Sequence, residues 1–332
     1  METKTSRKTI QEITNQFDLG NVQNSMEMKD GIVNFSYNIT TTKGKFVFQR
    51  LSEIFDERTI QDYQDVQSYL RTNGLHVPVL LHSIHGKPYY RNSHLWRVFE
   101  YIPNDGFPQQ TPEVGFELGK TLGKFHRLMA KSSFKPRFTL DGFHNTKQKI
   151  SELEETYSDL RYREKHSQLE GEYQYIISRI KNHFLPENLE KTIIHGDPNF
   201  ENFLTKDGKV ISLLDLDTLM EASPLIDLGD ALRSWCQTDD NKFNPIIFDK
   251  ALEGYNEENS LPYDKGLVKS AVGLITLELA ARFLTDYFKE EYFAWDNSKY
   301  KSSAEHNLER TRHCLRYHND FSIEFAKRRN LG

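Results

Sequence analysis

The segment from residue 192 to residue 217 constrains the fold of this chain more than any other. Two short apolar runs, 192–194 and 210–214, flank a polar stretch, and an Asp-Gly pair at 207–208 stands just before the second run. Asp-Gly is a strong signal for a two-residue β-hairpin, because both central residues of a type I′ turn take positive φ. The segment is therefore predicted to fold back on itself at residues 207–208.

The expected register of the hairpin follows from that turn. A type I′ turn pairs Lys206 with Lys209 and, with regular alternation, Asn202 with Leu213. Asp215 then points to the same face as Asn202, because side chains alternate along a strand with a period of two. Diagonal neighbours of this kind lie roughly 7–8 Å apart at the backbone. Two oxygen ligands so placed are expected to hold one Mg²⁺.

The segment also carries a carboxylate suited to accepting a proton. Asp197 precedes Asn202 by one loop, close enough to reach the same cavity without sharing the metal, and Asp217 falls at the frayed end of the second strand. A proton acceptor beside metal ligands is what phosphoryl transfer requires. Two other interpretations are open. In the first, residues 215–217 form a solvated strand end. In the second, the segment belongs to a metal-dependent hydrolase, although such a site usually needs more His and carboxylate ligands nearby than this segment has.

The motif His195-Gly-Asp197-x4-Asn202, followed by Leu-Asp215-Leu-Asp217, resembles that of the aminoglycoside phosphotransferase and choline kinase group. The resemblance implies an α+β, bilobal, protein-kinase-like fold, with a small N-terminal antiparallel-sheet lobe and a larger, mostly helical C-terminal lobe. It implies ATP and Mg²⁺ as cofactors. It further implies that Asp197 is the catalytic base and that Asn202 and Asp215 are metal ligands.

A narrower resemblance covers most of the chain. The segments 48–51, 96–101, 214–220, 226–233 and 281–287 are similar to segments of bacterial N-acetylhexosamine 1-kinases. This likeness implies phosphorylation of the anomeric hydroxyl of N-acetylglucosamine or N-acetylgalactosamine. Gly196 departs from the Asn that the characterised sugar kinases have there, so the acceptor is less firmly implied than the chemistry.

Length and charge set broad limits on the chain. Its 332 residues suffice for two lobes, and 43 Lys and Arg against 48 Asp and Glu give a net charge of −5. That balance does not suggest nucleic-acid binding. Two cysteines, no apolar run of membrane-spanning length and no apolar start of a signal peptide predict a cytoplasmic enzyme without a membrane partner. The expected partner is a small-molecule substrate, a sugar or amino sugar, and the oligomeric state stays open.

Apolar periodicity predicts the order of elements. The expected helices lie near 9–19, 56–72, 112–129, 146–184, 270–293 and 306–318, and the expected strands at 34–40, 45–50, 77–81 and 95–102. The charged helices of 146–184 are expected to be exposed and broken near Gly171. A break at 103–110 is interpreted as a linker. It divides a nucleotide-binding lobe, residues 1–102, from a catalytic and substrate-binding lobe, residues 103–332.

The residues that bind the nucleotide are predicted to lie in the first lobe. The Asp30-Gly31 turn lacks the three glycines of a protein-kinase phosphate loop, so the side chains of Asn34 and Ser36 are expected to bind phosphate instead, unless the segment is an ordinary strand turn. Backbone groups of Glu100 and Ile102 are expected to bind adenine at the hinge.

Arg50 ends a strand where kinases place a phosphate-binding Lys, and its planar fork suits phosphate oxygens. The alternative is a surface Arg at a strand end. Its partner in the following helix stays open among Glu57, Asp62 and Asp65.

The acceptor is predicted from weaker signals. Asp230, Arg233 and Arg282 are expected to bind a sugar, with Trp235 as a stacking ring. Asp230 and Arg233 are also spaced as an exposed helical ion pair, and Arg282 forms a similar pair with Asp286. Two further hypotheses are a kinase of an amino alcohol or aminoglycoside and a pseudokinase that serves as a binding module. The catalytic groups retained in the 192–217 segment weigh against the pseudokinase.

Overall fold

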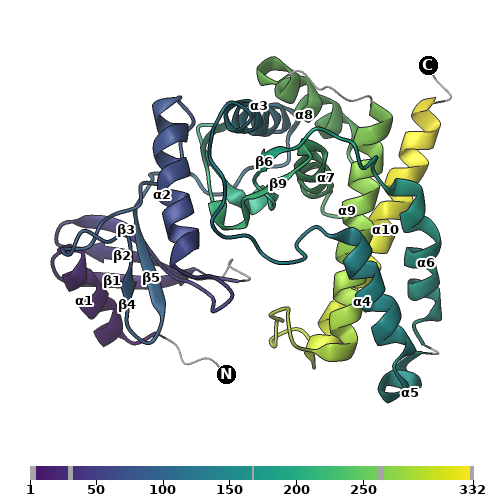
Figure 1. Ribbon diagram of the computed structural model, residues 1–332, viewed down its shortest axis with the longest axis horizontal. Helices are drawn as coiled ribbons and strands as arrows, with labels where there is room; N and C mark the ends of the chain where they lie inside the picture. Colours follow the sequence, from purple (N-terminus) through teal and green to yellow (C-terminus); the bar gives the residue numbers. More distant parts are fainter. Residues whose placement is uncertain (1–4, 29–32, 167, 260–264, 330–332) are drawn as a thin grey trace. The chain divides into compact units, whose positions relative to one another are not determined.

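A computed structural model describes residues 5–28, 33–166, 168–259 and 265–329 (Figure 1). These residues gather into two compact units. The first unit lies within Met1–Phe107, Ser132–Leu140 and Glu201–Leu219, and the second within Pro108–Lys131, Asp141–Phe200 and Met220–Gly332. No helix in the described ranges is long and apolar enough to cross a membrane.

The first unit is built on a five-stranded antiparallel sheet with the order β1-β2-β3-β5-β4 (Figure 1). Its strands are β1 (Val22–Met28), β2 (Phe35–Thr41), β3 (Gly44–Arg50), β4 (Tyr90–Arg91) and β5 (Leu95–Glu100). The predicted β2–β3 hairpin and the strand at 95–102 are confirmed. Strand β1 was not predicted, because it is an edge strand in which only Val22 is buried.

Two helices accompany the sheet, α1 (Arg7–Gln16) and α2 (Glu57–Thr72), and both confirm the sequence prediction. Helix α1 begins where Ser6 accepts a hydrogen bond from the Thr9 amide. Its apolar side joins one buried cluster with the sheet: Ile10, Ile13, Phe17, Leu19, Val22, Tyr37, Ile39, Phe48, Trp96 and Val98. Burial of these side chains holds the helix on the sheet.

The strand predicted at 77–81 is wrong. Only Leu80 forms a bridge there, opposite Phe99. Pro78 has no amide hydrogen to donate, so a regular ladder cannot run through it. Amide bonds from Leu81 to Val98 and from Glu100 to Val79 still tie the segment to β5.

The 203–213 hairpin groups with the first unit, whereas the sequence-based division places it in the second lobe. Strand β7 (Phe203–Lys206) exchanges backbone bonds through Thr205 with Asp105 and Gly106. In strand β8 (Lys209–Leu213), the Leu213 amide donates to the His76 carbonyl at 3.0 Å. These bonds explain the grouping. The functional division at residues 103–110 stays a prediction.

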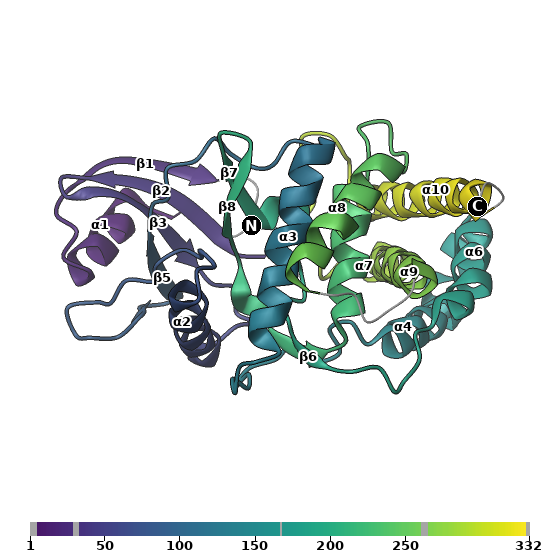
Figure 2. The ribbon, with the colours of Figure 1, turned by 90° about the horizontal axis from the view of Figure 1, so that it is seen from above.

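The second unit is mostly helical (Figure 2). Its helices are α3 (Pro112–Met129), α4 (Thr146–Ser158), η1 (Leu160–Tyr162), α5 (Arg163–His166), α6 (Glu170–Ile180), η2 (Lys181–His183), α7 (Pro224–Trp235), α8 (Pro245–Glu258), α9 (Lys265–Lys289) and α10 (Ser303–Arg329). A two-stranded ladder joins β6 (Thr192–Ile194) to β9 (Met220–Ala222). The predicted start of α3 is confirmed, because Pro112 follows the capping residue Thr111.

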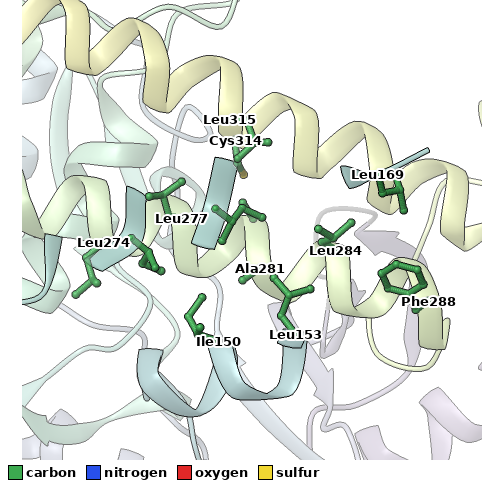
Figure 3. Packing of buried hydrophobic residues seen from close by; sticks show 13 residues of the cluster. Ile150, Leu153, Leu169, Leu274, Leu277, Ala281, Leu284, Phe288, Cys314 and Leu315 are labelled. Atoms are coloured by element: carbon green, nitrogen blue, oxygen red, sulfur yellow. The ribbon is translucent and has the colours of Figure 1, made fainter. Parts of the chain in front are cut away.

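Helix α9 is the centre of a buried apolar cluster in this unit. Figure 3 shows Leu274, Leu277, Ala281 and Leu284 along α9, with Ile150 and Leu153 of α4 below them and Cys314 and Leu315 of α10 above. The prediction that 146–184 is exposed is therefore only half right, since α4 and α6 each bury an apolar stripe. The break falls before α6, which runs through Gly171.

Helices α3 and α8 pack side by side at close range (Figure 2). A Cβ atom at Gly119 of α3 would overlap the Ala251 carbonyl carbon and oxygen of α8. A glycine is therefore required at this crossing, because any side chain would drive the two backbones apart.

Candidate active site

The loop that follows β6 is fixed by a buried carboxylate. Asp227 of α7 is fully buried and accepts hydrogen bonds from the His195 amide at 2.7 Å and the Gly196 amide at 2.8 Å. His126 Nε2 pairs with the same carboxylate at 2.8 Å. Burial alone would raise the pKa of Asp227, but the hydrogen bond and charge of His126 and the Gly196 amide lower it below its usual range. Asp227 is therefore ionised at neutral pH and holds the loop backbone.

Asp197 lies in the middle of this loop and is partly exposed. Its Oδ1 accepts a hydrogen bond from Asn199 Nδ2 at 3.0 Å. Partial withdrawal from water and the nearby charge of Asp230 raise the pKa of Asp197, against the opposing effects of His195, Asn199 and Arg233. A raised carboxylate pKa improves a proton acceptor, because basicity moves toward the operating pH.

The far end of the loop is held by α7 as well. Trp235 Nε1 donates to the Pro198 carbonyl at 3.1 Å, and the Phe200 amide donates to Ser234 Oγ at 2.9 Å. Trp235 is fully buried, so the hypothesis that its ring stacks on a sugar is wrong. The indole instead braces the loop that carries Asp197.

The turn of the 203–213 hairpin is as predicted, but the register beyond it is not. Asp207 and Gly208 have φ of 51° and 71°, and Lys206 pairs with Lys209. A bulge between residues 204 and 205 then shifts the ladder, so that Leu213 pairs with Phe203 rather than with Asn202. The alternation argument that aligned Asn202 with Asp215 is therefore wrong.

Asn202 and Asp215 are brought together by other means. Asn202 is a buried residue at the end of η3 (Phe200–Asn202), and its carbonyl accepts a hydrogen bond from the Leu214 amide at 2.8 Å. Because Leu214 directly precedes Asp215, this bond places the backbone of Asn202 close to that of Asp215. Asp215 itself has φ 51° and ψ 72°. This left-handed conformation is uncommon outside glycine, and non-glycine residues that adopt it are often found at functional sites.

Asp217 is bound by side chains of the first unit. It lies in η4 (Leu216–Thr218), and its two oxygens meet Arg97 Nη1 and Nη2 at 2.5 and 2.7 Å. Asn34 Nδ2 adds a third bond to Asp217 at 2.9 Å. Both charged side chains are about 1% exposed. Asp217 is therefore engaged by a buried arginine fork rather than turned toward a metal.

The residues predicted to bind nucleotide phosphate have partners within the first unit. Asn34 also accepts the Ser52 amide at 3.0 Å, and Ser36 Oγ accepts Gln49 Nε2 at 2.9 Å. The Asp30-Gly31 turn lies outside the described residues. A phosphate role for Asn34 and Ser36 stays a prediction.

Arg50 is buried at the end of β3, with its guanidinium 4.1 Å from the centre of the Phe35 ring. The interpretation of a surface arginine is therefore wrong. The three helix carboxylates pair elsewhere: Glu57 with Arg91, and Asp62 and Asp65 with Arg137.

The predicted hinge is partly engaged by the protein. The Glu100 amide donates to the Val79 carbonyl at 3.0 Å, and the Ile102 carbonyl accepts Asn104 Nδ2 at 2.7 Å. Adenine recognition through the backbone of Glu100 and Ile102 stays a prediction.

The acceptor candidates Asp230 and Arg233 form a buried ion pair on α7. Arg233 Nη2 meets Asp230 Oδ1 at 2.6 Å, and the two side chains are only 18% and 7% exposed. The exposed ion pair considered for these residues is thus ruled out. Asp230 Oδ2 is buried and accepts no hydrogen bond from any other described residue. A carboxylate oxygen in this state is ready to accept a donor from a ligand.

Arg282 of α9 lies among three aromatic rings, with its guanidinium 5.5 to 5.7 Å from the ring centres of Phe143, Tyr292 and Phe293. Asp286 accepts the backbone amides of residues 291–293 instead of forming the suggested helical pair. Asp286 therefore shapes the loop that places two of the rings around Arg282.

Two residues of the site were missed in the sequence. Asp227 lies on the buried side of an apolar helix. A carboxylate in that position could have been recognised in the sequence, because a buried carboxylate needs hydrogen-bond or charge partners. His144 reaches the Gly196 carbonyl, with Nε2 and the carbonyl oxygen 2.6 Å apart. No local pattern marks His144, because its partners come from distant parts of the chain.

Comparison with known proteins identifies distant relatives of this chain. The homoserine kinase of Gluconobacter oxydans is 20% identical over 302 residues, which are 85% of this chain and 87% of that protein. Amicoumacin kinase hAmiN, solved with AMP-PNP, Ca²⁺ and Ami, superposes with a TM-score of 0.66 at 17% identity, covering 94% of this chain and 93% of its own. The choline kinase LicA from Streptococcus pneumoniae gives a TM-score of 0.60 at 18% identity, covering 93% and 98%.

These solved structures share the protein-kinase-like fold, and the predicted fold class is confirmed. The sequence profile of the phosphotransferase enzyme family matches residues 27–260, which include strands β2 to β5, the 195–199 loop, the 203–213 hairpin and α7. The chain therefore belongs to the phosphotransferase enzyme family.

Proposed function

We propose that this phosphotransferase is a small-molecule kinase that transfers the γ-phosphoryl group of ATP to a sugar hydroxyl, with Mg²⁺ as its metal. The main support for the proposal comes from the loop that contains Asp197. Its backbone is held by the buried Asp227, and the pKa of its carboxylate is raised. This is the arrangement expected of a positioned proton acceptor.

In the proposed reaction the acceptor hydroxyl oxygen forms a bond to the γ-phosphorus, and the bond from that phosphorus to the β,γ-bridging oxygen breaks. ADP leaves with the electron pair, and the hydroxyl proton passes to Asp197. Asp197 also orients the hydroxyl for in-line attack. Arg50, Asn34 and Ser36 are assigned to the nucleotide phosphates, and the backbone of Glu100 and Ile102 to adenine.

Asn202 and Asp215 would hold the metal. Their donors are an amide oxygen and a carboxylate, the hard oxygen ligands that Mg²⁺ prefers, and the left-handed Asp215 lies next to the Leu214–Asn202 backbone bond. A bound metal neutralises charge on the transferred phosphoryl group.

The charges near Asp197 favour an uncharged acceptor. Asp230 is already paired with Arg233, and Glu278 with His144, so the described ion pairs leave little net negative charge to attract a cation. Asp230 Oδ2 nevertheless lacks a donor among the described residues. A sugar hydroxyl would provide one, and we propose the anomeric hydroxyl of an N-acetylhexosamine as the site of transfer, with Arg282 as a further contact.

A second candidate is a kinase of an amino alcohol. The distant similarity to homoserine kinases, and to a choline kinase in structure, favours this candidate. Homoserine is a zwitterion whose charges cancel, so the charge argument weighs against choline and aminoglycosides, which are cations, more than against homoserine.

The deciding experiment is an ADP-release screen with ATP and Mg²⁺ over N-acetylhexosamines, plain hexoses, homoserine, choline and aminoglycosides. Phosphorus NMR then identifies the product. An anomeric phosphate is expected, and a phosphate on homoserine would replace the sugar proposal with the second candidate. Asp215→Ala is expected to abolish Mg²⁺-dependent turnover. Full turnover in that variant would remove the metal role of Asp215.

A further inference from the structure

We propose that His144 is a positioning residue, which orients the Gly196–Asp197 peptide by donating a hydrogen bond to the Gly196 carbonyl. The inference rests on the proposed function for its kinetic consequence, but its structural part stands on the contacts of His144 alone. His144 lies in the 141–145 segment before α4, which is more than 50 residues away from Asp197 in the chain.

Gly196 is held from both sides. Its amide donates to Asp227 Oδ1 at 2.8 Å, and its carbonyl faces His144 Nε2 at 2.6 Å. Gly196 has φ +87°, a left-handed conformation that glycine adopts readily because it has no Cβ, and the same lack of a Cβ leaves the adjoining peptides more free to rotate than those beside other residues. The Gly196 carbonyl belongs to the peptide that leads directly into Asp197. Fixing that oxygen therefore fixes the backbone from which the Asp197 carboxylate projects.

His144 can do this because α9 holds its other nitrogen. Its Nδ1 lies 3.2 Å from Glu278 Oε1, and the buried Glu278 is also bonded by Thr146 Oγ1. Both ring nitrogens of His144 thus face oxygen acceptors. A neutral imidazole has only one N–H, so the two bonds together require the imidazolium form.

The surrounding charges agree with that form. The groups that face His144 are Glu278 from α9, Asp230 from α7 and the Gly196 carbonyl from the loop. Burial would lower the pKa of His144, but these three partners raise it to about 9. Deprotonation above that pH removes one of the two donors and releases either Gly196 or Glu278.

The backbone of His144 limits the choice of substitution. Its φ of 53° is left-handed, a conformation that is uncommon outside glycine but that histidine, asparagine and aspartate adopt more often than other residues. Asparagine tolerates the same conformation, so His144→Asn keeps the backbone while shortening the side chain and removing its charge. His183→Asn is the matched control, because His183 is in the same unit and bonds His318 rather than the catalytic loop.

The experiment compares wild type, His144→Asn and His183→Asn. His144→Asn is expected to lower kcat by about 10–100-fold, the scale of a misplaced catalytic group, while KM for ATP changes little. The kcat of wild type is expected to fall above about pH 9, and that alkaline decline is expected to be absent in His144→Asn. A general loss of structure would not remove the decline selectively.

Amide hydrogen exchange of residues 193–200 in the substrate-free protein tests the structural part without any turnover. Exchange is expected to be faster in His144→Asn than in wild type and in His183→Asn. Unchanged exchange together with unchanged kcat would overturn the inference. Faster exchange in a protein that phosphorylates no acceptor would keep the positioning role and remove the proposed function.

Discussion

Asp227→Asn is the substitution whose effect is most directly worked out from the structure. The carboxylate accepts three hydrogen bonds, from the amides of His195 and Gly196 and from His126. An asparagine keeps one oxygen acceptor, and its amide group must then face an N–H donor. At least two buried polar groups lose their partners, and at about 1–3 kcal/mol each the free energy of unfolding falls by about 2–6 kcal/mol.

Urea denaturation followed by circular dichroism measures this loss. Asp249→Asn is the matched control, because Asp249 lies on the exposed surface of α8 and pairs with Arg328 at 3.0 Å. Exposed pairs contribute about 0–1 kcal/mol, so the control is expected to unfold much like wild type. An Asp227→Asn protein as stable as the control would refute the reasoning that this carboxylate holds the loop.

The effect of pH gives a second readout of the same group. The pKa of Asp227 is lower in the folded protein than in the unfolded chain. Its stabilisation is therefore complete above the unfolded pKa and is lost as the pH falls through the folded value. The stability difference between wild type and Asp227→Asn should narrow in acid. A difference that stays constant down to low pH would mean that ionisation of Asp227 is not what stabilises the loop.

Two further predictions concern stability elsewhere in the second unit. Gly119→Ala should lower the free energy of unfolding by about 1–3 kcal/mol, because its Cβ overlaps the Ala251 carbonyl. The control Gly171→Ala meets no atom within 4 Å and should be neutral or stabilising. Equal denaturation midpoints for the two variants would contradict the close crossing of α3 and α8. Burial and the neighbouring His183 lower the pKa of His318 to about 3. As the pH drops from about 6.5 toward 3, this histidine therefore takes up a proton in the unfolded chain but not in the folded protein. The free energy of unfolding then falls by up to about 1.4 kcal/mol per pH unit. His318→Asn should make that decline shallower in denaturation titrations, and an unchanged slope would show that His318 does not contribute.

Local signals in the sequence were enough for much of the fold. The Asp207-Gly208 turn, the β2–β3 hairpin and the capped start of α3 each depend on residues close together in the chain, and all three are confirmed. Strand β1 was missed because a polar edge strand has no alternating pattern to detect. Pro78 should have excluded a regular strand at 77–81.

The site was predicted less completely, for a physical reason. The motif around Asp197 was visible in one segment, but the bulge that shifts the β7–β8 register has no local marker. The Arg97–Asp217 pair joins residues 120 positions apart, and the His144–Glu278 pair joins residues 134 apart. Such partners are chosen by tertiary packing, which periodicity along the chain does not report.

The most direct test of the central claim is the rate of phosphoryl transfer by Asp197→Asn beside wild type, with ATP affinity measured in parallel by calorimetry. The substitution keeps the shape of the side chain and removes its basicity. The expected result is a kcat lower by at least roughly 10²–10⁴-fold with ATP binding retained. Full activity in the Asp197→Asn protein would contradict the assignment of the catalytic base and, with it, the proposed mechanism.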